Sequence, residues 1–208
     1  MKYPDYWEKN KDWHNFPRGL PLFLAAIVLT GVIWWFSESP SDQLPDRTAP
    51  TQLRQTSDQF ADIGADAEYL SRMYNVSMSK SKLRHLLLYM HALCGYYSVD
   101  YALAKSVVSI ESAWDSKAVS SAKAVGLMQI MPSVAKDYST PKEDLYDPYV
   151  NLTIGVKHLA RLEGIYGTNT RLLLVAYNEG PRRANSRSKW YINKHAYASK
   201  VLDLAFGD

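Results

Sequence analysis

One carboxylic acid in this sequence has the surroundings that acid catalysis requires. Glu111 lies beside an apolar stripe in which Leu103, Val107, Ile110 and Trp114 recur at helical spacing. A carboxylate at such a position loses hydration, and desolvation favours its protonated form. A glutamate that stays protonated near neutral pH can act as a general acid. The pattern therefore makes Glu111 the candidate catalytic acid.

An ordinary structural interpretation of Glu111 is also open. A glutamate at the edge of a helix can turn towards water, or it can pair with Lys105 or Lys117. Most glycosidases use two carboxylates, and Asp115 is near enough in sequence to face the same way as Glu111. Because Asp115 follows the apolar stripe closely, it is more typical of a helix end than of a catalytic pair.

The elements that position Glu111 are predicted to be helices. Asp100 is a suitable N-cap for the helix that contains Glu111. Asp147 followed by Pro148 predicts another helix start, and Gly167 should end that helix. Further helices are expected over residues 82–97, 133–138, 171–177 and 195–206. Since alternating strand patterns are short and no internal repeat occurs, the expected fold class is mainly α.

An uncharged apolar run, residues 20–36, predicts a transmembrane anchor. The run LPLFLAAIVLTGVIWWF is close to the lower length limit for spanning a bilayer, and its last three aromatic residues are typical of a membrane interface. Residues 1–19 contain four Lys or Arg side chains, whereas the downstream flank is mainly acidic. The positive-inside rule therefore predicts a single-pass membrane protein, with a cytoplasmic N-terminal segment and the rest of the chain outside the cytoplasm.

Two other interpretations of residues 20–36 are weaker. A cleaved signal peptide would have a shorter apolar region, and no convincing cleavage site follows Trp34 and Trp35. A buried core helix would not have such sharp polar borders. Residues 37–52 include Pro40, Pro45 and Pro50 among polar residues and are predicted to be a linker.

Residues 53–79 are predicted to form an amphipathic helix before a catalytic domain over residues 80–208. Leu53, Phe60, Ala67 and Tyr74 recur every seven residues. Self-association through residues 53–74 is one possibility. The alternative is a first helix that packs on the catalytic domain or lies on the membrane surface. The repeat is short and contains Gly64, which favours this alternative over self-association.

Composition and motifs argue against several other chemistries. Cys94 is the only cysteine, so no internal disulfide can form, and its apolar surroundings predict a buried small side chain. The histidines lack metal-ligand spacing, phosphate-binding glycine motifs are absent, and the net charge of +3 does not demand a nucleic-acid partner. We therefore expect no metal and no cofactor. Residues 180–202 contain six basic and no acidic side chains, as in a solvated surface or a site for an anionic polymer or membrane.

Three ordered motifs resemble those of the soluble-lytic-transglycosylase (SLT domain) family. They are Glu111-Ser112, residues 126–132 (GLMQIMP) and residues 176–181 (AYNEGP). Residues 147–159 resemble the connecting helix of that family, and Tyr197 resembles a tyrosine of its final helix that lies near the catalytic acid. The resemblance covers roughly residues 96–206. It implies a lysozyme-like helical fold, related to goose-type lysozyme, and cleavage of peptidoglycan glycan strands. Together with the predicted anchor, it implies a protein of the bacterial inner membrane with a periplasmic catalytic domain.

The resemblance also implies roles for individual residues. In the reaction of the family, the C6 hydroxyl of N-acetylmuramic acid attacks its own C1, which leaves a 1,6-anhydro end without using water. Glu111 would be the acid and then the base, and Tyr197 would orient it. The residues expected to bind substrate are Ser112, the carboxamides of Gln129 and Asn178, and the apolar side chains of Met128 and Tyr177.

The chain departs from the family pattern at several positions. Lys123 stands where the family usually has glycine, and Glu179 stands where it usually has a small residue. Asp115 or Glu179 could activate a water molecule, which would make the protein a lysozyme-type hydrolase. A scaffold of an envelope-spanning machine, which binds the cell wall and contacts its protein partner through residues 53–74, is a third possibility. The intact Glu111 argues against a purely structural role.

Overall fold

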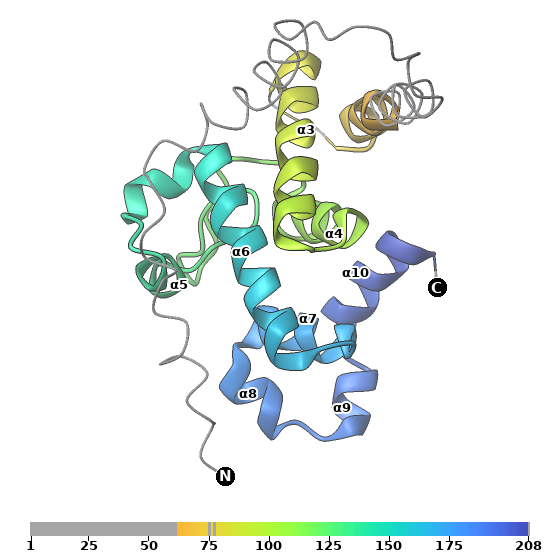
Figure 1. Ribbon diagram of the computed structural model, residues 1–208, viewed down its shortest axis with the longest axis vertical. Helices are drawn as coiled ribbons and strands as arrows, with labels where there is room; N and C mark the ends of the chain where they lie inside the picture. Colours follow the sequence, from red (N-terminus) through yellow and green to blue (C-terminus); the bar gives the residue numbers. More distant parts are fainter. Residues whose placement is uncertain (1–61, 75, 77, 208) are drawn as a thin grey trace, which may run out of the picture. The chain divides into compact units, whose positions relative to one another are not determined.

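Helices form nearly all of the regular structure in a computed structural model that describes residues 62–74, 76 and 78–207 (Figure 1). The sequence-predicted anchor, the linker and the start of the amphipathic segment lie outside these residues. None of the helices described is long and apolar enough to cross a membrane. From residue 78 to residue 207, extended pairing is limited to isolated bridges of Val125 with Val119 and with Ile130. The predicted mainly helical character is thus confirmed.

The helices follow one another closely along the chain. In order, they are α3 (Lys80–Tyr97), α4 (Tyr101–Ser112), α5 (Pro132–Asp137), the 3-10 helix η2 (Lys142–Tyr146), α6 (Pro148–Tyr166), α7 (Thr170–Glu179), α8 (Pro181–Ser186), α9 (Lys189–Asn193) and α10 (Ala196–Phe206).

Capping residues begin and end the helices where the sequence predicts. The Asp100 carboxylate accepts a hydrogen bond from the Leu103 N–H and starts α4. Asp147 caps α6 with Pro148 as its first residue, and Gly167 ends that helix. These side chains satisfy backbone groups that a helix terminus would otherwise leave unpaired. The predictions for the starts of α4 and α6 and for the end of α6 are confirmed.

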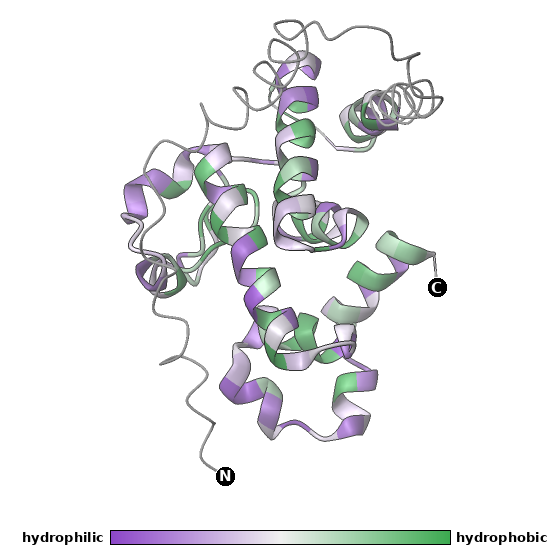
Figure 2. Cartoon of the chain, in the orientation of Figure 1, coloured by the Kyte–Doolittle hydropathy of each residue, from purple (hydrophilic) through white to green (hydrophobic). Residues whose placement is uncertain are grey.

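A buried apolar face joins the helices into one core. α3 packs against α4 and α6, α7 contacts α6, α8 and α10, and α10 also lies along α4 (Figure 1). α7 and α10 are largely apolar, whereas α8 is mostly hydrophilic (Figure 2). Cys94 is buried within this core, as predicted. The packing of α10 on α4 brings two segments far apart in sequence to one place.

The part of the amphipathic segment that the structure describes packs on the helices that follow it. Residues 62–73 are helical, and Ile63, Ala67 and Leu70 are buried in the common core. Asp66 accepts a hydrogen bond from the Tyr101 hydroxyl and pairs with Lys105 Nζ at 2.6 Å, both on α4. Of the two interpretations of this segment, the described residues fit the helix packed within the domain, because their apolar stripe is already covered.

Two short helices occupy a segment for which the sequence predicts no regular structure. Gly180-Pro181 ends α7 as expected, but Pro181 is also the first residue of α8. Ser188 then caps α9 by accepting a hydrogen bond from the Tyr191 N–H. The basic side chains of this segment are exposed.

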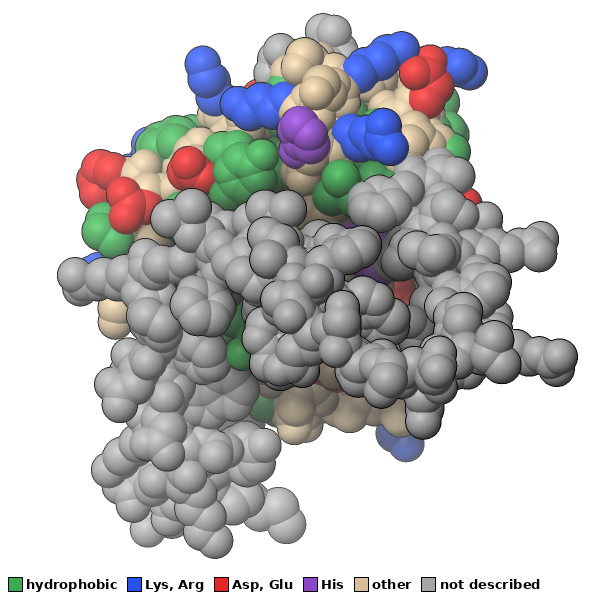
Figure 3. Space-filling view, turned by 45° about the horizontal axis from the view of Figure 1, so that its top comes forward, with side chains coloured by type: hydrophobic (Ala, Val, Ile, Leu, Met, Phe, Trp, Pro, Cys, Tyr) green, Lys and Arg blue, Asp and Glu red, His purple; other side chains and the backbone are tan. Residues whose placement is uncertain are grey.

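Figure 3 shows one face of the whole molecule. On this face, Lys and Arg side chains gather along the upper edge, and most of the visible Asp and Glu side chains lie at the left edge.

Candidate active site

Glu111 and Tyr197 meet at the contact between α4 and α10. The Tyr197 hydroxyl donates a hydrogen bond of 2.7 Å to Glu111 Oε1. Lys105, an alternative partner for Glu111, instead pairs with Asp66. The glutamate is therefore oriented by a neutral hydroxyl group, and the pairing with Lys105 that would have made it an ordinary surface residue is not formed.

Burial gives the Glu111 carboxyl the properties of an acid near neutral pH. Desolvation raises the pKa of Glu111 to about 6, and the hydrogen bond from Tyr197 opposes part of that rise. The two effects have distinct physical origins, since burial penalises the charged form and the hydroxyl stabilises it. The site thus holds an acid that is protonated in mildly acidic solution and can also act as a base once ionised.

The end of α4 fixes the backbone next to Glu111. Ala113 and Trp114 adopt left-handed φ angles of 50° and 67°, which is unusual for consecutive residues other than glycine. The Trp114 side chain is fully buried, and its Nε1–H donates to Ser109 Oγ at 2.9 Å. This anchored indole holds the chain in its strained turn immediately after Ser112.

Ser112 ties the same helix end to the loop of residues 124–131. Its hydroxyl donates a hydrogen bond of 2.8 Å to the Leu127 carbonyl. Among the residues expected to bind substrate, Ser112 thus makes a bond within the protein that connects the helix of Glu111 with the loop of Met128 and Gln129.

Asn151 holds that loop from the opposite side. Its buried side chain accepts a hydrogen bond from the Met128 N–H and donates to the carbonyls of Val125 and Leu145, all at 2.8–2.9 Å. Gly126, with φ of +77°, passes so close that an added Cβ would lie 2.3 Å from Asn151 Nδ2. The sequence predicts Asn151 to lie in the connecting helix but does not predict this role, although a polar residue within an apolar helix is a signal for it.

Met128 does not lie where an apolar wall for a sugar would be needed. Its side chain is fully buried and packs against Gly155, where a Cβ would lie only 2.1 Å from the Met128 sulfur. The expectation that Met128 contacts substrate is therefore corrected, because its side chain fills the core between the loop and α6.

Gln129 and Tyr177 both use their polar groups to brace the same loop. Gln129 has a left-handed φ of 46°, and its Nε2 donates to the carbonyls of Ala118 and Gly126. The Tyr177 hydroxyl donates to the Met128 carbonyl at 2.8 Å. Burial and the nearby Glu111 raise the pKa of Tyr177 well above its usual value. These contacts leave both side chains partly exposed.

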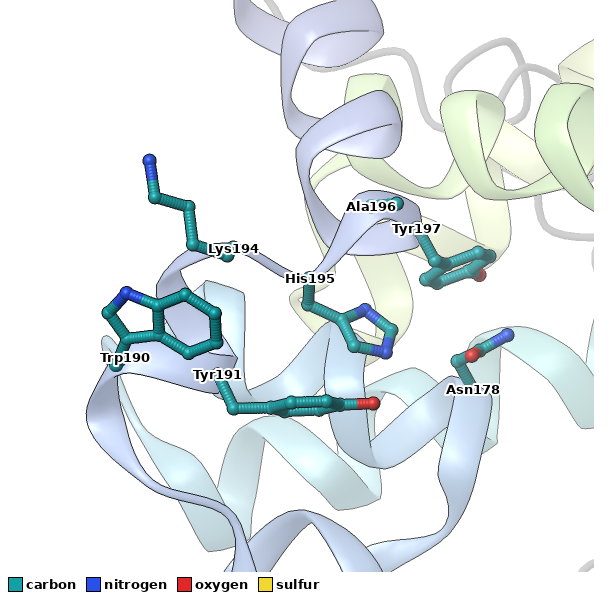
Figure 4. Close-up of a pocket in the computed structure, with 7 residues that line it drawn as sticks. All are labelled: Asn178, Trp190, Tyr191, Lys194, His195, Ala196 and Tyr197. Carbon is teal, nitrogen blue, oxygen red and sulfur yellow. The ribbon is translucent and has the colours of Figure 1, made fainter.

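An open pocket adjoins the Glu111–Tyr197 pair. Its volume is about 420 Å³. Asn178 and Tyr197 lie at one end, Trp190 and Lys194 at the other, and the rings of Tyr191 and His195 between them (Figure 4). Asn178 and Tyr197 were predicted from the sequence, but the aromatic wall was not, although Trp190 and Tyr191 are adjacent within a basic segment. The indole of Trp190 is 72% exposed and could stack on a sugar face.

The two departures at Lys123 and Glu179 have different structural outcomes. Lys123 adopts a φ of +71°, so the loop keeps a conformation that suits glycine without having one. Glu179 accepts hydrogen bonds from Tyr191, Arg187 and His195, which hold the pKa of its carboxyl below the usual value. Lys123 thus occupies a backbone conformation that favours glycine, whereas Glu179 forms a cluster of side-chain contacts.

The arrangement can donate and accept a proton at one carboxyl group. Within the part of the chain that the structure describes, no three His, Cys, Asp or Glu side chains cluster as metal ligands would. Asp115, the nearest acid in sequence, is exposed and accepts a hydrogen bond from the Lys117 N–H. The chemistry available from these residues is proton transfer by Glu111 next to a groove suited to polar, ring-shaped groups.

Comparison with known proteins gives a consistent family. The family described as transglycosylase SLT domain matches residues 89–199, which is more than half of the chain. A putative soluble lytic murein transglycosylase of Haemophilus influenzae is 38% identical over 109 residues, which cover 49% of this chain and 18% of that protein. A transglycosylase of Enterobacteria phage PRD1 is 35% identical over 121 residues, covering 56% of this chain and 43% of that protein.

The similarity is confined to part of each relative. The chain spans less than half the length of either of these two proteins. Among solved structures, the lytic transglycosylase Slt of Pseudomonas aeruginosa superposes with a TM-score of 0.49 at 23% identity, covering 56% of this chain and 22% of that one.

Proposed function

Because the chain belongs to the transglycosylase SLT domain family, we propose that it is a peptidoglycan lytic transglycosylase. The proposed reaction cleaves the β-1,4 bond between N-acetylmuramic acid and N-acetylglucosamine and forms a 1,6-anhydro end. The observation that carries the proposal is the partly buried Glu111 carboxyl, which accepts a hydrogen bond from Tyr197 and whose pKa is raised by desolvation to about 6. That pair is what a reaction with a single acid requires.

Glu111 performs both proton transfers in the proposed mechanism. The protonated carboxyl gives its proton to the glycosidic oxygen as the bond from C1 to that oxygen breaks. The C6 hydroxyl of the same muramic acid then bonds to C1, and the Glu111 carboxylate takes the proton of that hydroxyl. The carboxyl ends in its starting state, and no water is consumed. Tyr197 keeps the carboxyl pointed at the reacting oxygens.

The surroundings of the other acids favour this reaction over hydrolysis. A hydrolase would need a second carboxylate to activate water or to act as nucleophile. Asp115 is exposed and bonded to the backbone after α4, and Glu179 is already bonded to three side chains. Neither group is poised as a base, which supports the lytic reaction and disfavours the lysozyme-type alternative.

The products of purified peptidoglycan distinguish the two reactions. The experiment incubates the full chain with intact sacculi and analyses the released muropeptides by mass spectrometry. We expect fragments with 1,6-anhydro ends, whose mass is lower by one water than that of reducing-end fragments. Reducing ends alone would replace the proposal with hydrolysis, and the absence of any released fragment would refute glycan cleavage.

The pH profile should report the ionisation of Glu111. The free enzyme needs this carboxyl protonated, so kcat/KM should be highest below its pKa of about 6 and should fall as pH rises through that value. Initial rates on solubilised glycan strands between pH 4 and pH 8 test this, with a melting curve at each pH as the control for unfolding. A profile that stays flat through pH 6 would exclude Glu111 as the titrating acid.

Tyr197→Phe should lower turnover more than substrate binding. Its hydroxyl is needed in the transition state, when the acid must point at the leaving oxygen, so kcat should fall while KM changes little. Loss of one such hydrogen bond is worth about 1–3 kcal/mol, or roughly 10- to 100-fold in rate. Kinetics and melting curves are measured together. An unchanged kcat with a lower melting temperature would mean that Tyr197 serves only the core.

We further propose that residues 20–36 anchor the protein in the inner membrane with the catalytic domain in the periplasm. The uncharged run and the basic residues before it support this topology. A reporter enzyme that works only in the periplasm should be active when fused after Asp208, and a reporter that works only in the cytoplasm should be inactive there. The opposite pair of results would reverse the topology.

A further inference from the structure

Four segments of the chain meet at the carboxylate of Glu179, the last residue of α7. The Tyr191 hydroxyl of α9 donates to its Oε1, and Arg187, which precedes α9, donates Nε–H to its Oε2 at 2.9 Å. His195, the N-cap of α10, lies 3.3 Å from Oε1 through its Nε2. Arg187 also stacks over the Tyr191 ring at 4.2 Å. One acidic side chain thus connects α7, α9 and the start of α10.

His195 links Glu179 to the first turn of α10. Its Nδ1 accepts a hydrogen bond from the Ala198 N–H, which caps the helix, while Nε2 faces Glu179. Both contacts are satisfied by one neutral tautomer, with the proton on Nε2 donated to Glu179. The side chains of His195 and Glu179 are only 9% and 13% exposed, and Figure 4 shows the imidazole between Tyr191 and Tyr197.

Tyr197 follows the cap by two residues. It is the second residue of α10, so the cap determines where its side chain begins. Further along α10, Ala198, Val201 and Leu202 pack in the core, and the helix therefore does not depend on the cap to stay folded. Loss of the cap should consequently shift or loosen the first turn and leave the rest of α10 in place.

We propose that Glu179 and His195 are positioning residues that hold the first turn of α10 so that the Tyr197 hydroxyl bonds to Glu111. This inference rests on the proposed function of the Glu111–Tyr197 pair and adds to it two residues that do not touch Glu111. It gives a role to Glu179, the acidic residue at a position where the sequence resemblance leads one to expect a small side chain. The hydrogen bond between Glu179 and His195 is the link on which the proposal depends.

The ionisation of Glu111 provides a test that does not require activity. The Tyr197 hydroxyl lowers the pKa of Glu111, so any variant that displaces this hydroxyl should raise that pKa. In the full chain with ¹³C-labelled glutamate, the Glu111 carboxyl is titrated by NMR, assigned by its absence in Glu111→Gln. We expect a higher pKa in Tyr197→Phe, and a shift in the same direction in Glu179→Ala and in His195→Ala.

Matched variants separate positioning from general loss of stability. Glu179→Gln keeps an oxygen that can accept from both Tyr191 and His195 and loses the ion pair and the hydrogen bond with Arg187. Because the link to His195 is kept, its Glu111 pKa should stay close to wild type. Lys189→Gln changes an exposed basic side chain of α9 and should have no effect. If Glu179→Ala does not fold, His195→Ala tests the same link from its other end.

Kinetics on glycan strands provide the second readout. Glu179→Ala and His195→Ala should each lower kcat about 5- to 30-fold, less than or equal to the effect of Tyr197→Phe. KM should change little in Glu179→Ala, whereas His195 also lines the pocket, so kcat alone is compared for His195→Ala. In the Tyr197→Phe background neither substitution should lower kcat further, because each acts through the hydroxyl that is already absent. Additive losses in that background would overturn the proposal.

The outcomes distinguish this inference from the proposed function. An unchanged Glu111 pKa in both alanine variants, alongside a raised pKa in Tyr197→Phe, would refute positioning even if the enzyme cleaves peptidoglycan. A Glu179→Gln variant as defective as Glu179→Ala would refute the link through His195. If the wild-type chain releases no fragments, the proposed function fails, and the NMR titration still decides whether Glu179 and His195 hold Tyr197 on Glu111.

Discussion

Glu111→Gln is expected to reduce glycan cleavage by roughly three orders of magnitude or more while leaving the fold intact. General acid catalysis contributes about 10²- to 10⁴-fold, and here one carboxyl supplies both the proton for the leaving oxygen and the base for the C6 hydroxyl. The amide has nearly the same shape and can still accept the hydrogen bond from Tyr197, but it cannot deliver a proton. Release of muropeptides from sacculi is the measurement.

The thermal behaviour of Glu111→Gln is its control. The wild-type carboxyl is buried at some cost, so a neutral amide should leave the melting temperature unchanged or slightly raised above pH 6, where the wild-type group is charged. Asp115→Asn is the matched change of a neighbouring exposed acid and should keep activity. Cleavage near the wild-type rate by a folded Glu111→Gln protein would remove Glu111 from the reaction.

Asn151→Ala is expected to lower the free energy of unfolding by about 2–4 kcal/mol and to reduce activity with it. The substitution leaves the Met128 N–H and the carbonyls of Val125 and Leu145 without their partner in a buried place. For a chain of this size the melting temperature should fall by roughly 4–16 °C. Because Asn151 holds the loop that Ser112 ties to α4, cleavage should decrease even below the new melting temperature.

Denaturant unfolding and glycan cleavage, measured on the same preparations, test this expectation. Asn193→Ala removes an exposed carboxamide from α9 and should change the free energy of unfolding by no more than about 0.5 kcal/mol. Equal stability of Asn151→Ala and wild type would show that water can replace all three hydrogen bonds, and the loop would then not depend on this side chain.

Local sequence signals predicted the helices of the domain well. Asp100, Asp147 and Gly167 each satisfy backbone groups by contacts within a few residues, so their effect is visible without the fold. α8 and α9 were not predicted because they are short and their polar residues give no clear helical period. Glu179 contacts side chains 8 to 16 positions further along the chain, at the end of α8, in α9 and at the start of α10, and contacts over such separations leave no local pattern in the sequence.

The site was only partly predictable for a related reason. Glu111 stands out as an acid beside an apolar stripe, but its bond with Tyr197 spans 86 positions and was expected only from the family resemblance. Met128 and Gln129 are polarisable or polar residues in a motif, and nothing in their types indicates whether they face the groove or the interior. The loop conformation set by Gly126 and Asn151 turns Met128 inward.

The end of α4 directly after Ser112 has an electrostatic consequence for Glu111. Glu111 is the penultimate residue of the helix, so it lies where the aligned peptide dipoles leave a partial negative charge. This partial charge destabilises the ionised carboxylate by about 0.3–1 kcal/mol relative to the protonated carboxyl. This contribution comes from the backbone and therefore persists through any side-chain substitution that preserves the helix end. The left-handed turn at Ala113 and Trp114, by stopping the helix directly after Ser112, keeps the acid inside the field of the helix terminus.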